Sequence, residues 1–242
     1  MRRCLTAILV VALISVNNRD AAAQSAKDMA AASALYLTPV GSLAPIMVSP
    51  GTKGEKSVDN ISGRFSHFSP KTGNGDNSIG ASYYHQAGMN AAVSATVGML
   101  MPGCPTGTSC NSVLMLGGDV HSTLWNSKAS KGSTTATSIN LQGSLGYGRE
   151  SSVSAVSAAV GVPFAVSMEQ ASKARVSAFV TPGFGWGRLS PKGFTAESGT
   201  RPLVGAGAAW MAPAGWGLHA SFQKIMIKDG GNSFGLGFSW KM

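Results

Sequence analysis

Two residues that could do acid–base chemistry stand close together in the sequence, Asp119 and His121. Because they are two positions apart, an extended strand would place both side chains on one face. With a serine they would outline a hydrolase, and with His219 they would outline a metal site. The sequence contains no nucleophile motif, no H-E-x-x-H and no paired carboxylates to complete either site. We therefore expect no catalytic and no metal site. The alternative is an enzyme that acts on lipid or peptide through these three residues.

Two glycine-rich stretches could suggest a nucleotide site, GFGWG at 183–187 and LVGAGAAW at 203–210. Neither contains G-x-G-x-x-G between a strand and a helix, which dinucleotide binding requires. Glycine on one face of a strand instead lets a small barrel curve without crowding its interior. We expect no cofactor.

Cys104 and Cys110 lie in the stretch MPGCPTGTSCN, where Pro, Gly, Thr and Ser indicate a turn. The stretch contains no His, Asp or Glu that could complete a metal site. In an exported protein, two cysteines six residues apart are typical of a disulfide that closes a loop. We therefore predict a Cys104–Cys110 disulfide.

The overall composition does not suit a soluble surface. Only 12% of the residues are charged and 31 of 242 are glycine, whereas a typical globular protein has about 25% charged residues. The net charge is +9, but Lys and Arg are scattered and do not form a basic cluster with aromatic residues. We therefore expect no nucleic-acid partner. A soluble, secreted β-sandwich that binds a ligand is a second alternative, which the low charge disfavours.

The N-terminus has the form of a secretory signal peptide. Arg2 and Arg3 precede an apolar run at 5–16, and Ala21-Ala22-Ala23 offers small residues for cleavage. We expect residues 1–23 to be removed during export, and Cys4 with them. A leader at 24–59 follows, with a short Ala-rich helix at 26–37 and then an irregular segment that contains Pro39, Pro45 and Pro50.

From about residue 60 to the end, apolar residues alternate with small or polar ones, which predicts β-strands with one apolar face. Segments of about ten residues with this alternation are typical of membrane-spanning strands. Ten such strands are expected, an even number as in single-chain bacterial barrels. Their ranges are 60–68, 79–86, 90–100, 112–125, 135–148, 153–166, 174–188, 200–211, 215–227 and 231–240.

The chain ends on GGNSFGLGFSWKM at 230–242, in which Phe234, Leu236, Phe238 and Trp240 share one face. The pattern of Ser233, Gly235, Phe238 and Trp240 resembles the C-terminal assembly signal of Gram-negative outer-membrane β-barrel proteins. In that family, the barrel-assembly machinery reads the last strand, which then closes against the first. Members usually end on the aromatic residue, whereas Lys241 and Met242 follow it here.

The resemblance covers residues 60–242 by pattern and only the last strand by motif. It implies an all-β fold, a closed antiparallel up-and-down transmembrane barrel of eight to ten strands, in the outer membrane. Outer-membrane lipids, lipopolysaccharide and the assembly machinery are then the expected partners, and small solutes are compatible with it.

Within this barrel, we expect one set of residues at the membrane surfaces and another set in the lumen. Tryptophans near strand ends are expected to form aromatic girdles at the membrane surfaces: Trp186, Trp210, Trp216 and Trp240. Polar residues of the opposite face are expected in the lumen: Asp119, His121, Asn140, Gln142, His219 and Gln223. Few charges are expected on this face, namely Asp119 and Arg175.

A barrel of about ten strands is near the narrow end of the known range. The function expected is therefore non-enzymatic, either a narrow pore or a structural and surface-interaction protein.

Overall fold

The computed structural model describes residues 32–35, 58–69, 75–87, 91–104, 110–127, 134–227 and 231–242. The expected signal peptide at 1–23 and most of the expected leader lie outside these residues. Among the described residues, no helix has the length and apolar character needed to cross a membrane.

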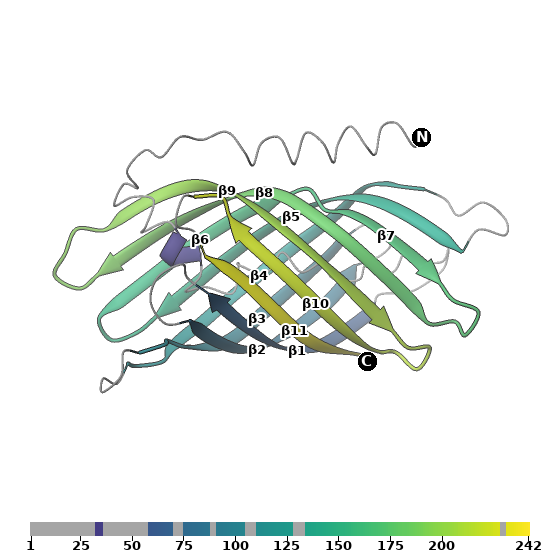
Figure 1. Cartoon of the computed structure of the whole chain (residues 1–242), viewed down its shortest axis with the longest axis horizontal. Coiled ribbons are helices and arrows are strands. Elements are labelled where there is room, and N and C mark those ends of the chain that lie inside the picture. The colour runs from purple at the N-terminus through teal and green to yellow at the C-terminus, as the bar shows by residue number, and fades with distance from the viewer. Residues whose placement is uncertain are drawn as a thin grey trace.

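Alternating apolar residues produce one antiparallel sheet that closes on itself (Figure 1). Each strand pairs with the next along the chain, apart from β6 and β7, so the connections run up and down. The strands are β1 (Val58–Ser69), β2 (Asp76–Ala87), β3 (Ala91–Met101), β4 (Val113–Asn126), β5 (Thr135–Arg149), β6 (Val153–Gly161), β7 (Phe164–Glu169), β8 (Arg175–Pro191), β9 (Glu197–Met211), β10 (Trp216–Ile225) and β11 (Asn232–Lys241).

Strands β6 and β7 are two halves of one barrel stave, because both pair with β5 and with β8. The break falls at Val162 and Pro163, where proline has no N–H to donate to the ladder. Hydrogen bonds from Val162 N to Pro182 O (3.0 Å) and from Asn140 N to Pro163 O (2.9 Å) continue the pairing across it. The barrel therefore has ten staves, and the closed ten-strand fold predicted from the sequence is confirmed.

The last strand closes the barrel against the first. Trp240 of β11 pairs with Ile61 of β1, and Phe238 pairs with Gly63. The side-chain period of two then fixes which residues face outward, because a one-residue slip would turn every side chain to the other side. This register exposes Phe234, Leu236, Phe238 and Trp240 on the outer wall.

The two ends of the barrel differ. At one end, called the terminal end, the C-terminus lies beside the start of β1, since Met242 N donates to Asp59 O (2.9 Å). At the opposite end, called the loop end, β1 leads to β2, β3 to β4, β5 to β6, β8 to β9 and β10 to β11. The longest of these connections joins β3 to β4 and carries both cysteines.

A single helical turn at residues 32–35 lies inside the barrel outline, toward the loop end (Figure 1). It belongs to the Ala-rich segment for which the sequence predicts a helix at 26–37. The rest of that predicted helix lies outside the described residues.

Candidate functional site

The interior of the barrel carries polar side chains beside an apolar cluster of Leu100, Val113 and Met115. Thr181 of β8 and Gln142 of β5 are fully buried, and Gln223 of β10 is only 3% exposed. Other buried polar residues lie on the same inward face: Ser66, Gln86, His121, Asn140, Ser144 and Ser157. A soluble barrel would bury apolar side chains in this place.

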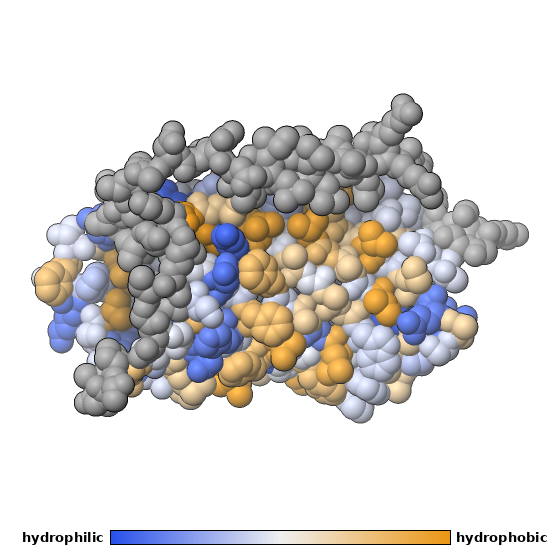
Figure 2. Space-filling model, in the orientation of Figure 1, coloured by the Kyte–Doolittle hydropathy of each residue, from blue (hydrophilic) through white to orange (hydrophobic). Residues whose placement is uncertain are grey.

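The outer wall has the opposite character. Leu145 is 68% exposed, and large apolar side chains from every strand except β9 are also exposed on this wall. Figure 2 shows such side chains over the middle of the visible wall, with hydrophilic ones gathered toward its ends. Soluble monomers rarely expose an apolar surface of this extent to water.

Among the described residues, Arg64 and Asp119 bring opposite charges into the lumen, and Arg201 of β9 shares the inward face nearer the loop end. Ser94 of β3 donates its hydroxyl to Asp119 Oδ2 of β4 (3.0 Å), and the Asp119 backbone N–H donates to Ser94 Oγ (3.2 Å). Arg64 of β1 interacts electrostatically with the Asp119 carboxylate. Gly80 and Gly98 lie beside Arg64 in the register of β2 and β3 and carry no side chains that would separate the two charges.

The two histidines expected in the lumen lie on opposite walls. His121 is on β4 and His219 is on β10, five staves away round the ten-stave barrel. His219 lies over Gly237 of β11, where an added Cβ would come 2.1 Å from His219 Nε2. Its imidazole therefore needs glycine at this position.

This arrangement does not assemble the chemistry that Asp119, His121 and His219 could have provided together. The hydroxyl beside Asp119 bonds to a carboxylate and not to an imidazole. His121 Nε2 is buried without a hydrogen-bond partner among the described residues. The part of the chain that the structure describes also brings no three His, Cys, Asp or Glu side chains together as metal ligands.

The helical turn at 32–35 occupies the lumen near the loop end. Leu35 is fully buried, and it packs with Ala32, Ala159 of β6, Leu203 of β9 and Ile225 of β10. The partly buried Ile227 covers the same cluster. This is the one place where residues outside the wall and residues of the wall share an apolar core among the described residues.

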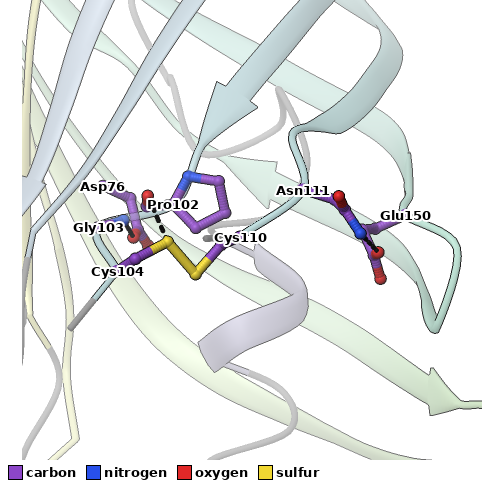
Figure 3. Close-up of a disulfide and its surroundings, with 7 residues drawn as sticks. All are labelled: Asp76, Pro102, Gly103, Cys104, Cys110, Asn111 and Glu150. Carbon is purple, nitrogen blue, oxygen red and sulfur yellow. Dashed lines mark hydrogen bonds between the residues drawn. A yellow bond between two sulfur atoms is a disulfide. The ribbon is translucent and has the colours of Figure 1, made fainter. Parts of the chain in front are cut away.

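The predicted disulfide is confirmed at the loop end (Figure 3). Cys104 and Cys110 are bonded, with their Cα atoms 5.9 Å apart. Hydrogen bonds fix the connection on both sides of the bridge: Gly103 N donates to Asp76 Oδ1 (2.9 Å) and Asn111 Nδ2 donates to Glu150 Oε1 (2.8 Å).

Glu150 anchors the next turn as well. Both hydroxyls of Ser151 and Ser152 donate to its carboxylate, and Ser152 N donates to Oε2 (2.7 Å). Together with Asn111, these donors hold the pKa of the Glu150 carboxyl below its usual value. A carboxyl with a lowered pKa keeps its bonds above its ordinary pKa and loses them only as the pH falls through the lowered value.

The expected girdle tryptophans divide between the two ends. Trp210 of β9 and Trp216 of β10 meet edge to face (4.8 Å between ring centroids), and Trp216 stacks on Phe238. Trp240 lies beside Phe238 in the same cluster, near the terminal end. Trp186 lies in the loop-end half of β8, where it pairs with Thr200.

The assembly-signal residues all lie on β11, at the seam with β1. Ser233 pairs with Phe68 and Gly235 with Ser66, while Phe238 and Trp240 pair nearer the terminal end. Ser233 and Gly235 take inward positions, and the two aromatic residues are exposed on the outer wall.

Sequence reasoning missed Arg64, Arg201 and Leu35 as residues of the lumen. The few lumen charges expected from the sequence, Asp119 and Arg175, did not include Arg64, which also has an inward position. The alternation of Ser62, Arg64 and Ser66 against Ile61 and Phe65 would have given its direction. Arg175 has the same inward parity as Thr181 and lies at the terminal end of β8, with its guanidinium 4.0 Å from Glu169. No local pattern marks Leu35 as a residue inside a barrel.

No known protein-family profile matches this chain, and no curated protein matches it in sequence. Among solved structures, the chain is similar to Ail, the attachment invasion locus protein of Yersinia pestis, with a TM-score of 0.34 and 11% identity over 77% of this chain and 97% of that one. It is also similar to the N-terminal β-barrel domain of Pseudomonas aeruginosa OprF, with a TM-score of 0.37 and 10% identity over 78% and 98%.

A third similar structure is the β domain of the Bordetella autotransporter BrkA, with a TM-score of 0.44 and 10% identity over 78% of this chain and all of that one. These structural neighbours are β-barrels of Gram-negative outer membranes.

Proposed function

We propose that this chain is a non-enzymatic outer-membrane β-barrel that forms a narrow, polar pore, which its own N-terminal segment restricts near one end. The inverted polarity of the wall is the observation that carries this proposal. Apolar side chains are exposed on the outside, while Gln142, Thr181 and Gln223 are buried on the inside. In a membrane, lipid would contact the apolar outer side chains and water would hydrogen-bond to the polar inner ones.

Polar atoms inside the barrel support a hydrated lumen. The side-chain amide of Gln223 and the hydroxyl of Thr181 are buried without hydrogen-bond partners among the described residues. An unpaired buried polar group costs about 1–3 kcal/mol, so these groups are stable only where water or a polar solute can reach them. A dry interior would leave this cost uncompensated.

The width and charge of the lumen define the solutes that fit. Ten staves enclose a narrow passage compared with the 16 to 18 of open porins. Arg64 and Asp119 contribute one positive and one negative charge to it, which cancel, while Arg201 has an inward position nearer the loop end. Small polar solutes without a strong charge preference match these properties.

The same proposal includes a route of export and assembly, which rests on two sequence patterns. A signal peptide at 1–23 would direct the chain across the inner membrane, and the β11 pattern at Ser233, Gly235, Phe238 and Trp240 would be read by the barrel-assembly machinery. Outer-membrane lipids and lipopolysaccharide then surround the wall. Trp210, Trp216 and Trp240 at the terminal end and Trp186 at the other would lie at the two membrane surfaces.

Planar-bilayer conductance tests the pore directly. The refolded chain is expected to give small, discrete current steps, far below those of a 16-stranded porin. Uncharged sugars of increasing size should lose access at a small cutoff in vesicle-swelling measurements. A folded chain that gives no steps and admits no solute in either measurement would contradict the pore.

A surface-interaction role is a second candidate, and the loop end favours it. The β3–β4 connection is held by a disulfide, by Asp76 and by Glu150. Anchors on both sides of a connection reduce the conformational entropy that it loses when a partner binds. Cells with the Cys104→Ser/Cys110→Ser variant should then show reduced adhesion at unchanged barrel abundance, whereas pore conductance should stay the same.

A further inference from the structure

Two arginines share the outer wall of the barrel near the loop end. Arg149 ends β5, Arg188 lies on β8, and both are exposed. Arg149 pairs with Ser154 of β6, which pairs with Ser190, two residues beyond Arg188. Strand spacings of about 4.8 Å and residue spacings of about 3.3 Å then place the two arginine Cα atoms about 12 Å apart. Both long side chains can therefore reach one group between them.

An aromatic side chain lies next to each arginine, toward the middle of the barrel. Tyr147 is two residues before Arg149, and Trp186 is two residues before Arg188. The period of two gives each aromatic residue the same outward direction as its arginine. Tyr147 and Trp186 are 37% and 36% exposed. Aromatic rings of this kind mark the depth of the lipid headgroups, so the arginines lie at or just above that depth.

The surroundings leave this positive charge uncompensated. Neither arginine forms an ion pair with the part of the chain that the structure describes. Their cross-strand partners include Ser154 and Ser198, which carry no charge. The carboxylate that follows Arg149 in sequence, Glu150, already accepts hydrogen bonds from Asn111, Ser151 and Ser152. Glu197 pairs with Leu189, on the opposite parity from Arg188.

We propose that Arg149 and Arg188, above Tyr147 and Trp186, form a binding site for the phosphorylated headgroup of a lipopolysaccharide molecule in the outer leaflet. Guanidinium groups bind phosphate through paired, charge-assisted hydrogen bonds. The Ser154 hydroxyl lies between the two arginines and can donate a third. The acyl chains of the same lipid would lie along the exposed side chains of Val156 and Val160. This site rests on the proposed function, because it requires the loop end to face the outer leaflet.

The test uses the full chain, purified in its folded form in detergent. Lipopolysaccharide is added with its phosphates intact or after enzymatic dephosphorylation, and the temperature at which the folded gel band converts to the unfolded band is measured. The intact lipid is expected to raise that temperature and the dephosphorylated lipid to raise it much less. Inorganic phosphate at the same concentration should leave it unchanged, which separates a lipid site from a site for free phosphate.

The Arg149→Gln/Arg188→Gln variant should need about tenfold more lipopolysaccharide for the same rise. Lys173→Gln/Lys241→Gln removes the same charge at the terminal end of the barrel and should respond like the parent chain. Arg149→Lys/Arg188→Lys keeps the positive charge but lacks the two parallel N–H donors of each guanidinium, so it should respond only weakly to the intact lipid. This variant provides the test if the glutamine variant does not fold. The site is refuted if the arginine variants respond like the parent, if the control loses the response equally, or if dephosphorylated lipid is as effective. Failure of the proposed function would instead show as the lack of any folded, heat-sensitive band in the parent chain.

Discussion

Leu35 takes the space that a side chain at position 185 would need: a Cβ on Gly185 of β8 would lie 2.8 Å from Leu35 Cδ2. A residue near the N-terminus and a glycine of the barrel wall are thus matched in shape. The match explains how a helical turn fits inside a ten-stave barrel, where most interior space is filled by side chains.

Removing the Leu35 side chain should open the lumen. Leu35→Ala is expected to weaken docking of the turn by about 2 kcal/mol or more, as for other buried leucines. Single-channel conductance should rise, while the wall stays folded because its ladder is untouched. Ser33→Ala, on the same turn, is the matched control. Equal conductance of Leu35→Ala and the parent would show that the turn does not restrict the pore.

Gly237→Ala should disturb His219. The added methyl would occupy the space of the His219 ring, and overpacking of this kind costs about 1–3 kcal/mol. The heat-conversion temperature of the folded band should fall. His219→Ala/Gly237→Ala should recover part of the loss, with the remainder due to Gly63 O, 2.9 Å from the same Cβ. A double variant no more stable than Gly237→Ala would contradict the contact.

Arg64 and Asp119 should set the charge preference of the pore together. Asp119→Asn is expected to shift selectivity toward anions and Arg64→Gln toward cations, each by about threefold or more, because charges act strongly in a narrow pore. The double variant should return close to the parent. Reversal potentials in a salt gradient measure this, with Lys173→Gln as a control charge outside the lumen. Unchanged potentials in both single variants would remove these residues from the conduction path.

The outer wall should reject charge at mid-depth. Leu236 of β11 is exposed and faces outward between Phe234 and Phe238. Leu236→Lys in lipid vesicles should lower the free energy of unfolding by about 2–4 kcal/mol, the cost of lysine near a bilayer midplane. Phe194→Lys, in the exposed turn after β8, should cost little. A harmless Leu236→Lys would mean that water, and not lipid, covers this wall.

Breaking the disulfide should loosen the loop end without opening the barrel. A loop of this length is stabilised by its disulfide by about 2 kcal/mol. Cys104→Ser/Cys110→Ser should therefore be cut faster by protease between these positions while keeping its heat-sensitive band. Asn111 and Glu150 should hold the loop in mild acid as at neutral pH, because the pKa of Glu150 is lowered. Identical cleavage rates with and without the bridge would contradict its role.

Much of the fold could be predicted because each strand of a membrane barrel alternates lipid-facing apolar residues with small or polar residues that face the lumen. The alternation from Val156 to Val166 gave one strand, and the structure places β6 and β7 there as one stave. Pro163 interrupts it, and proline in a sheet is a local signal. The disulfide could also be predicted from local sequence, because Cys104 and Cys110 lie in one turn and have few other possible partners.

The lumen could be predicted only in part. The strand parity places His121 and Gln142 inside, but it says nothing of which walls face one another. His121 and His219 share a parity and yet lie on opposite walls, because stave order depends on closure of the whole sheet. Leu35 could not be placed from sequence, since its partners Leu203 and Ile225 follow it by more than 160 residues.

The most direct test of the membrane barrel is the migration of the outer-membrane fraction on an SDS gel, unheated and boiled. A closed barrel with a lipid-facing wall should remain in that fraction after carbonate extraction and should change its apparent size on boiling. A chain that is released by carbonate, or that migrates identically with and without heating, would contradict the account.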